Sequence, residues 1–233
     1  MFKFIIVAFM LLFNLHADNK AALEAFKKSD YKKAFEIYEK NAKDGDTTAQ
    51  SALSYLYANG LGTPKDIEKS IYWLEKSASN GNANAQYDLG MFYLRGNNVE
   101  QDSKKAFEFL SKSSEQNNAN AQYDLALMYY KGDGVDLNVT KSVQLLESAA
   151  TSGHKIAQQN VGRVYMQLLK FDEASKWFEK NAAEGDTTVY HFLAEIYCEL
   201  EDFAKAKAWA QKAIDEGNKE AVELYKKYEL QKY

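Results

Sequence analysis

The stretch NANAQYDLGMFYLRG, residues 82–96, returns almost unchanged as NNANAQYDLALMYYKG at residues 117–132. The shared phrase Ala-Asn-Ala-Gln-Tyr-Asp-Leu begins at Ala83 and again at Ala119, 36 residues later. A fixed period of roughly 20 to 50 residues is typical of chains built from stacked copies of one small structural unit. The spacing of these two stretches therefore decides how the rest of the chain is divided.

The period continues in both directions. Ala-Gln pairs stand at residues 49, 85, 121 and 157, and a tyrosine follows eight residues after each alanine. Beyond them the step shortens to 32, to Val189 with Tyr197 and then to Ala221. We therefore predict repeat units at residues 18–48, 49–84, 85–120, 121–156, 157–188 and 189–220, followed by a terminal helix at 221–233.

Each unit carries two helical patterns, and together they predict an all-α fold. In the unit from Ala85, Leu89 and Tyr93 share one helix face, and Ala106 with Leu110 marks a second helix. Second helices are predicted to end at residues that tolerate a left-handed backbone, which are Gly45, Gly81, Asn117, Gly153, Gly185 and Gly217. A lone helix pair cannot bury its apolar face, so we expect the units to stack as a right-handed α-solenoid of helix-turn-helix repeats.

Two sets of recurrent residues are predicted to build this stack. The tyrosines that recur in phase are expected in the core, and they are Tyr57, Tyr93, Tyr129, Tyr165 and Tyr197. The recurrent glutamines are expected to form a hydrogen bond at a helix start or between units, and they are Gln50, Gln86, Gln122 and Gln158.

The turns of the longer units carry a pattern that resembles a known family. They read Tyr57-x-x-Gly60-x-Gly62, Tyr93-x-x-Gly96 and Tyr129-x-x-Gly132-x-Gly134. With the later Trp/Phe-x-x-Lys-Ser/Ala-Ala-x-x-Gly, this pattern is similar to Sel1-like repeats, which are relatives of the tetratricopeptide repeat. The resemblance is strongest over residues 49–156, and the units with 32-residue spacing look more like plain tetratricopeptide repeats. It implies a scaffold or adaptor that binds a protein or peptide partner.

Carrying over the tetratricopeptide phase predicts which side chains line a concave groove formed by the first helices. The inward positions are Tyr55, Asn59, Tyr87, Met91, Arg95, Tyr123, Leu127, Tyr130, Lys131, Gln159, Arg163, Met166, His191, Glu195 and Cys198. Tyrosine, methionine and arginine are enriched at interface cores. The chain's only two arginines are in this set, where they could meet carboxylates of a partner. An alternative is that several of these tyrosines only pack between neighbouring helices.

The N-terminal segment predicts export. Lys3 precedes an unbroken apolar run from Phe4 to Phe13, and Leu15-His16-Ala17 offers a small residue before Asp18. This arrangement is typical of a signal peptide, here cleaved after Ala17, and we expect a periplasmic or secreted protein. The run is too short to span a bilayer, so no stable membrane insertion is expected after cleavage. The net charge of −4 shows no basic field for nucleic acid.

Catalytic motifs are missing from the sequence. It has no His-Glu-x-x-His, Gly-x-Ser-x-Gly or Walker loop, and we predict no catalytic residue, metal site or cofactor. The single cysteine, Cys198, allows no internal disulfide. Secreted Sel1-type proteins of Helicobacter and its relatives are cysteine-rich and described as penicillin-binding or β-lactamase-like. This chain lacks their cysteine pairs, so a β-lactamase-like, penicillin-binding or peptidoglycan-binding protein is an alternative implied by the resemblance alone.

One local motif predicts a modification. Asp136-Leu137-Asn138-Val139-Thr140 contains the only Asn-x-Ser/Thr of the sequence, with an acid two residues before the asparagine. It resembles the extended acceptor sequence of bacterial N-glycosylation, which makes Asn138 a candidate glycosylation site in an exposed turn. A chance match in a polar loop is the alternative.

Overall fold

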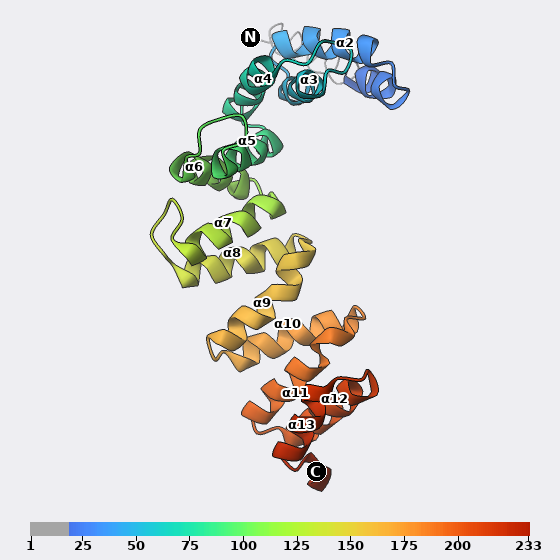
Figure 1. The fold of residues 1–233 in the computed structure, drawn as a ribbon, viewed down its shortest axis with the longest axis vertical. Coiled ribbons are helices and arrows are strands. Elements are labelled where there is room, and N and C mark those ends of the chain that lie inside the picture. The colour runs from blue at the N-terminus through green and yellow to red at the C-terminus, as the bar shows by residue number, and fades with distance from the viewer. Residues whose placement is uncertain (1–18) are drawn as a thin grey trace, which may run out of the picture. The chain divides into compact units, whose positions relative to one another are not determined.

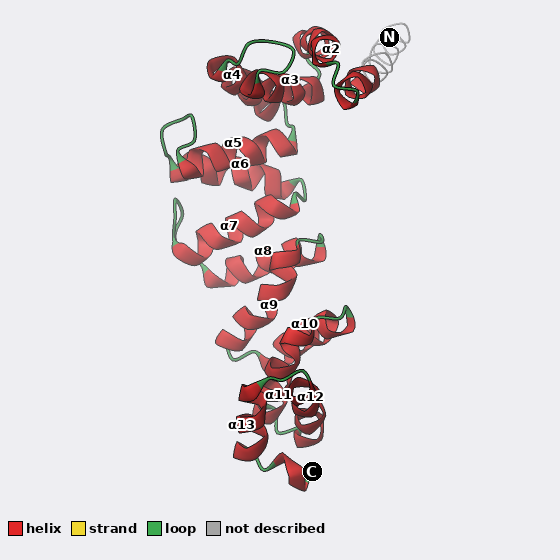
Figure 2. Cartoon of the chain, turned by 45° about the vertical axis from the view of Figure 1, so that its right-hand side comes forward, coloured by secondary structure: helices red, strands yellow, loops and turns green. Residues whose placement is uncertain are grey.

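The computed structural model describes residues 19–233, so the predicted signal peptide lies outside the described residues. Every regular element in residues 19–233 is helical (Figure 2). After a helix over residues 19–27 the elements are α2 (Tyr31–Lys43), α3 (Thr47–Asn59), α4 (Ile67–Ser79), α5 (Ala83–Arg95), α6 (Ser103–Glu115), α7 (Ala119–Lys131), α8 (Val139–Thr151), α9 (Lys155–Gln167), α10 (Phe171–Ala183), η1 (Thr187–Val189), α11 (Tyr190–Glu199), α12 (Phe203–Asp215), α13 (Lys219–Lys227) and η2 (Leu230–Lys232).

Neighbouring helices pack in pairs, as expected for a solenoid (Figure 1). We call the 19–27 helix, α3, α5, α7, α9 and α11 the first helices, and the helix that follows each of them a second helix. Pairs such as α3 with α4 and α11 with α12 pack closely, and each second helix also contacts the next first helix, as α4 does α5. The predicted all-α solenoid of helix hairpins is confirmed.

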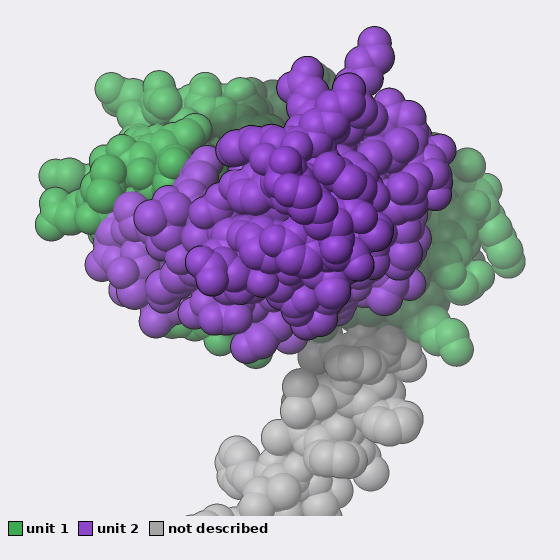
Figure 3. Space-filling view, turned by 90° about the horizontal axis from the view of Figure 1, so that it is seen from below, with its two compact units in different colours: residues 1–137 green, residues 138–233 purple. Residues whose placement is uncertain are grey.

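The described residues form two compact units, which meet between Leu137 and Asn138 in the sequence (Figure 3). We call them the N-terminal unit and the C-terminal unit. The boundary falls in the turn between α7 and α8, so α7 is the last helix of one unit and α8 is the first helix of the other. Each unit is described separately below.

Polar caps and left-handed residues fix where the helices begin and end. The Asn82 side chain accepts a hydrogen bond from the Ala85 N–H at 3.0 Å, and this satisfies one of the free N–H groups at the start of α5. Asp46 does the same for α3. All six residues predicted to stop second helices have positive φ, from 63° at Asn117 to 96° at Gly45. The sequence prediction of the helix ends is therefore confirmed.

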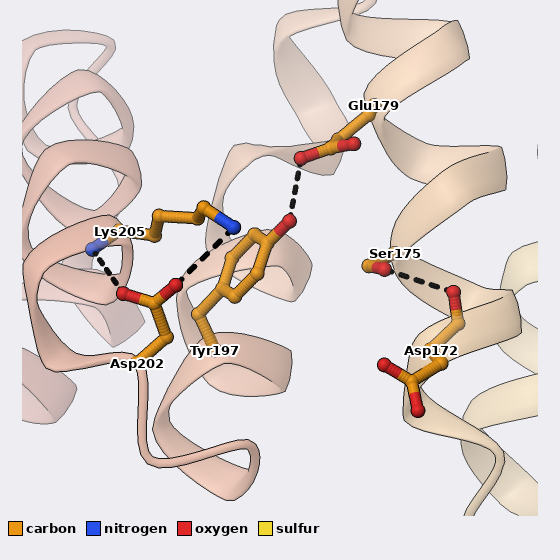
Figure 4. A network of polar contacts seen from close by, with 6 residues as sticks. All are labelled: Asp172, Ser175, Glu179, Tyr197, Asp202 and Lys205. Atoms are coloured by element: carbon orange, nitrogen blue, oxygen red, sulfur yellow. Dashed lines mark hydrogen bonds and ion pairs between the residues drawn. The ribbon is translucent and has the colours of Figure 1, made fainter.

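The recurrent tyrosines lie in the core, with one exception. Tyr57, Tyr129, Tyr165 and Tyr197 are 6–7% exposed, whereas Tyr93 is only half-buried. In Figure 4 the Tyr197 hydroxyl on α11 donates a hydrogen bond to Glu179 on α10 at 2.5 Å, and the Lys205 ammonium lies 4.7 Å from the centre of the Tyr197 ring. Burial and the neighbouring Glu179 raise the pKa of Tyr197 to about 12, so this hydroxyl remains a donor.

The recurrent glutamines connect successive hairpins, as predicted. Gln86 Nε2 donates to the Ala78 carbonyl at 3.1 Å, and Gln86 Oε1 accepts from Gln116 Nε2 at 2.7 Å. Gln50 forms the equivalent pair, donating to Ala42 O and accepting from Asn80 Nδ2. Gln122 differs, because its Oε1 is the buried side-chain acceptor without a hydrogen-bond partner in residues 19–233.

Hairpins of both lengths close in the same way. The backbone N–H at the start of the second helix donates to the carbonyl of the recurrent tyrosine, from Asp66 to Tyr57 at 3.0 Å and from Asp202 to Tyr197 at 2.9 Å. The four additional residues of the longer unit therefore leave this closure intact. In one of the shorter turns Leu169 has φ 55° and is 74% exposed, which is an unfavourable conformation for a leucine.

Candidate functional site

In the N-terminal unit the candidate site starts on α3 with an exposed tyrosine. Tyr55 is 54% exposed, and its ring meets the Phe26 ring of the 19–27 helix edge-on at 6.1 Å. Asn59, one turn further along α3, is also exposed, and its amide donates to the Tyr55 carbonyl at 2.8 Å. The first helices of successive hairpins therefore lie side by side on this face, with an aromatic ring available to a partner.

The next part of this face joins α5 to α7 by a polar contact. The Tyr87 hydroxyl donates to Asp124 Oδ2 at 3.0 Å. Burial, followed by the Asp124 charge, raises the pKa of Tyr87 to about 12, and the nearby Arg95 charge opposes the shift. The Tyr87 hydroxyl therefore helps to hold α5 against α7. Arg95, at the end of α5, is exposed and has no carboxylate within 4.0 Å among the described residues.

The predicted groove residues on α7 differ in how far their side chains are exposed. Tyr130 is 45% exposed and Lys131 is exposed, so both are available to a partner. Tyr123 and Leu127 are half-buried. With Tyr55 and Arg95, the exposed part of this face combines tyrosine rings with an arginine, two residue types that are enriched among interface hot spots.

In the C-terminal unit the predicted residues form a charged cluster on α9 and α11. The Arg163 guanidinium lies 5.0 Å from the centre of the Phe192 ring, a cation–π contact between the two first helices. His191 is half-buried beside them. Burial lowers the pKa of His191, and the carboxylates of Glu220 and Glu195 oppose that shift. Arg163 and Glu195 are both exposed.

Gln159, one turn before Arg163 on α9, is exposed and lines a polar depression of about 190 Å³. The other side chains that line it are Lys155, Gln158, Asn181, Glu184 and Asp186. Asn181 is 4% exposed, and its amide donates to the Gln158 carbonyl at 2.9 Å, so it serves the packing of α9 on α10.

Two of the inward positions face the protein interior. Met91 is 9% exposed, and it follows Gly90, where α5 comes close to the Leu110 side chain of α6. Cys198 is 3% exposed, and burial raises its thiol pKa to about 11, which keeps the thiol protonated. Neither residue offers much surface to a partner, so their contribution is to packing.

Asn138 begins α8. Its side-chain oxygen accepts a hydrogen bond from the Lys141 N–H at 2.9 Å, and the residue is exposed. The predicted acceptor sequence therefore runs from an exposed turn into the first turn of a helix. Glycosylation of Asn138 stays a prediction.

Within residues 19–233 no group of three or more histidine, cysteine or acidic side chains is arranged to hold a metal ion. His154 caps α9, accepting a hydrogen bond from the Ala157 N–H at 3.1 Å. None of the described helices is both long and apolar enough to cross a membrane.

An apolar pocket in the N-terminal unit was missed by the sequence prediction. Its lining residues are Leu23, Phe26, Tyr38, Ala52, Tyr55 and Leu56. Of these, the sequence analysis placed only Tyr55 on the binding face. Tyr38 gave a signal that could have been used, because the same position of later units carries Leu74, Leu110, Leu146, Phe178 and Ala210.

Sel1 repeats match the chain over residues 25–46, 47–82, 83–118, 119–154 and 190–218. The chain belongs to the Sel1 repeat family. The matched ranges leave out residues 155–189, which hold α9 and α10. Sel1 repeat proteins commonly act as scaffolds for protein interactions and are typically not enzymes.

Solved Sel1 structures share the fold. A protective antigen of uropathogenic Escherichia coli strains, displaying an SLR fold, is 26% identical with a TM-score of 0.72 over 89% of this chain. This chain spans 47% of that protein. A Sel1 repeat protein from Oxalobacter formigenes is 27% identical with a TM-score of 0.66, over 88% of this chain and 84% of that one. No curated protein matches the chain.

The cysteine-rich protein B of Helicobacter pylori is 27% identical with a TM-score of 0.45, over 55% of this chain and 92% of that one. This Sel1 chain has one cysteine, so it lacks the paired cysteines of such proteins, as the sequence analysis stated. Neither the comparisons nor residues 19–233 give any indication of β-lactamase activity.

Proposed function

We propose that this Sel1 repeat protein is an exported scaffold that holds an acidic, aromatic-containing segment of a protein partner against its first helices. The proposal rests on the exposure of the two arginines of this protein and on their lack of a carboxylate partner. Arg95 and Arg163 are both exposed on first helices, and neither has a carboxylate within 4.0 Å in the described residues. A planar guanidinium is suited to bidentate recognition of a carboxylate.

Aromatic side chains support the same proposal. Tyr55 and Tyr130 are about half exposed on first helices of the N-terminal unit, where Arg95 also lies. Large rigid rings and an arginine without a carboxylate partner, present in the same unit, are the composition expected of an interface centre. Export follows only from the sequence of residues 1–17, and it sets the compartment in which the partner is sought.

The proposal is tested by capture from a periplasmic extract with the immobilised mature chain, followed by mass spectrometry. The double variant Arg95→Gln/Arg163→Gln should lose the captured protein while its circular dichroism spectrum stays unchanged. A matched control, Lys104→Gln/Lys176→Gln, removes two exposed cations from the second helices α6 and α10. Equal capture by both variants would remove the arginines from the proposed site.

A parallel measurement addresses peptidoglycan. The mature chain is sedimented with purified sacculi from which proteins have been removed. Binding to sacculi that the arginine double variant retains would argue against a protein partner and for a cell-wall ligand.

A further inference from the structure

The residue that caps α8 differs from the caps of the other second helices. Asn138 holds this position in α8, whereas α10 has Lys170, whose side chain forms no cap. In α2, α4, α6 and α12 the cap is an aspartate, and these residues are Asp30, Asp66, Asp102 and Asp202. Asparagine therefore stands where the repeat otherwise favours a carboxylate.

The backbone at Asn138 does not account for this difference. Asn138 has φ −147° and ψ 91°, and Asp66 has φ −148° and ψ 100°. Asn138 Oδ1 accepts a hydrogen bond from the Lys141 N–H at 2.9 Å, and Asp66 Oδ1 accepts from the Lys69 N–H at 3.0 Å. An aspartate would therefore fit the same backbone and form the same cap.

The amide of the α8 cap lacks the charge that the aspartate caps use. Asp66 Oδ2 lies 3.1 Å from Lys69 Nζ, and Asp202 forms the same ion pair with Lys205 at 3.2 Å. The α8 sequence places a lysine at the equivalent position, Lys141. A negative charge is also favourable at a helix N-terminus. Capping alone therefore does not require asparagine in α8.

The amide adds a nitrogen atom at an accessible position. The cap uses Oδ1 of Asn138, and Nδ2 forms no hydrogen bond within residues 19–233. Asn138 and Thr140 are both exposed, and they form the only Asn-x-Ser/Thr of the sequence. Two positions after Asp66 and Asp102 the sequence has glutamate and lysine. The exchange of carboxylate for amide therefore coincides with the hydroxyl that an N-glycosylation acceptor needs.

We propose that Asn138 is N-glycosylated and carries its saccharide on the cap of α8. In the transfer a bond forms between Nδ2 and the anomeric carbon of a saccharide activated by a diphosphate leaving group. The anomeric C–O bond breaks with its electron pair going to the diphosphate, and Nδ2 gives one proton to a base of the transferase. The Oδ1 carbonyl is retained, so the modified side chain can still accept from the Lys141 N–H.

This inference rests on the export part of the proposed function, because N-glycosylation acceptors are surface segments of secreted proteins. It does not depend on the arginines or on the identity of the partner. The saccharide would add a bulky, solubilising group at the start of α8.

The test is mass spectrometry of the full chain purified from the cells that naturally produce it. Cleavage after lysine gives a peptide of residues 132–141, in which Asn138 is the only asparagine and Thr140 the only residue with a hydroxyl. We expect this peptide to carry a saccharide that resists mild alkali, because alkali releases sugars linked to threonine but not those linked to asparagine. A wild-type peptide without added mass would overturn the proposal.

Three variants, produced in the same cells, locate the linkage. Asn138→Asp restores the cap of the other hairpins and should yield a folded chain without the saccharide. Thr140→Ala keeps the amide and the cap but should also lose the saccharide, whereas Thr140→Ser should keep it. A saccharide that persists in Asn138→Asp would place the linkage on Thr140, and one that persists in Thr140→Ala would contradict the acceptor motif.

A matched control uses the equivalent cap of α6. Asp102→Asn supplies the same amide there, but lysine and not a hydroxyl lies two residues later, so this variant should gain no second saccharide. Modification at that position would show that a capping amide is enough and would contradict the role of Thr140.

The same spectra separate this proposal from the proposed function. A mature chain that begins at Asp18 but carries no saccharide would refute glycosylation and leave the exported scaffold standing. A glycosylated wild type that captures no partner would instead refute the proposed function alone.

Discussion

The glutamines that connect successive hairpins allow a sharp prediction, because Gln86 and Gln122 occupy the same position in different units but differ in hydrogen bonding. Gln86 is 5% exposed and uses both ends of its amide, at 3.1 Å and 2.7 Å. Gln122 is also 5% exposed, yet its Oε1 has no partner in the described residues. Methionine has a similar shape and no hydrogen-bonding amide, so Gln→Met measures what each amide contributes.

The magnitudes follow from these bonds. Each hydrogen bond contributes about 1 kcal/mol net, so Gln86→Met should lower the free energy of unfolding by about 2 kcal/mol. Gln122→Met removes a buried acceptor whose desolvation is not offset, and we expect a change close to zero or a small gain. The difference between the two variants, about 2 kcal/mol, corresponds to roughly a 30-fold change in the unfolding equilibrium.

The assay is urea denaturation followed by circular dichroism at 222 nm, with stabilities compared at equal m-values. Gln144→Met, at an exposed position of α8, is the control and should fall within about 0.5 kcal/mol of the wild type. If Gln122→Met destabilised the protein as much as Gln86→Met, the reasoning from the unpaired oxygen would be refuted.

Three further predictions concern backbone conformation and pH. Gly134 has φ 71°, and a Cβ there would lie 2.3 Å from the Ser103 carbonyl oxygen, so Gly134→Ala should lower the free energy of unfolding by more than about 2 kcal/mol in the same denaturation assay. Gly153 has φ 91° but open space around it, so Gly153→Ala should lower the free energy of unfolding by only about 1 kcal/mol. Leu169→Gly should raise stability by about 0.5–1 kcal/mol, since it relieves a left-handed leucine that is 74% exposed, and a lower melting temperature would contradict this. Burial is the main reason that the pKa of His191 is lowered in the folded protein. Below the ordinary histidine pKa near 6.5 the unfolded chain therefore binds more protons than the folded protein, and the free energy of unfolding should fall as the pH drops through that region. His191→Gln should flatten this pH dependence, and an unaltered slope would show that other groups cause it.

Much of the fold could be predicted from spacing alone, because a period enforces the same local interactions in every unit. The helix stops were predictable, since Gly45 and Asn117 are residues that tolerate positive φ. The glutamine contacts were predictable in kind, because a buried amide that recurs in phase must find a partner in the repeated packing.

The candidate site could be predicted less completely, because helical phase gives direction but not burial. Met91 shares its helix face with Tyr87 and Arg95, yet it is only 9% exposed, and the spacing along α5 gives no sign of that difference. The pocket at Tyr38 depends on how three helices meet, and no spacing within one helix reveals it. Leu169 was also not foreseeable, since leucine gives no signal for a left-handed turn.

The identical closure of long and short hairpins has a consequence for how such a chain can change over time. Because the bond from the second-helix N–H to the tyrosine carbonyl forms at 3.0 Å in the turn with four more residues and at 2.9 Å in the shorter one, the core does not register the length of the loop beyond it. The longer turn still meets the hairpin before it, since a Cβ at Gly134 would lie 2.3 Å from the Ser103 carbonyl oxygen, so a gain or loss of residues there has to be accommodated by the neighbouring hairpin and not by the one that carries the turn.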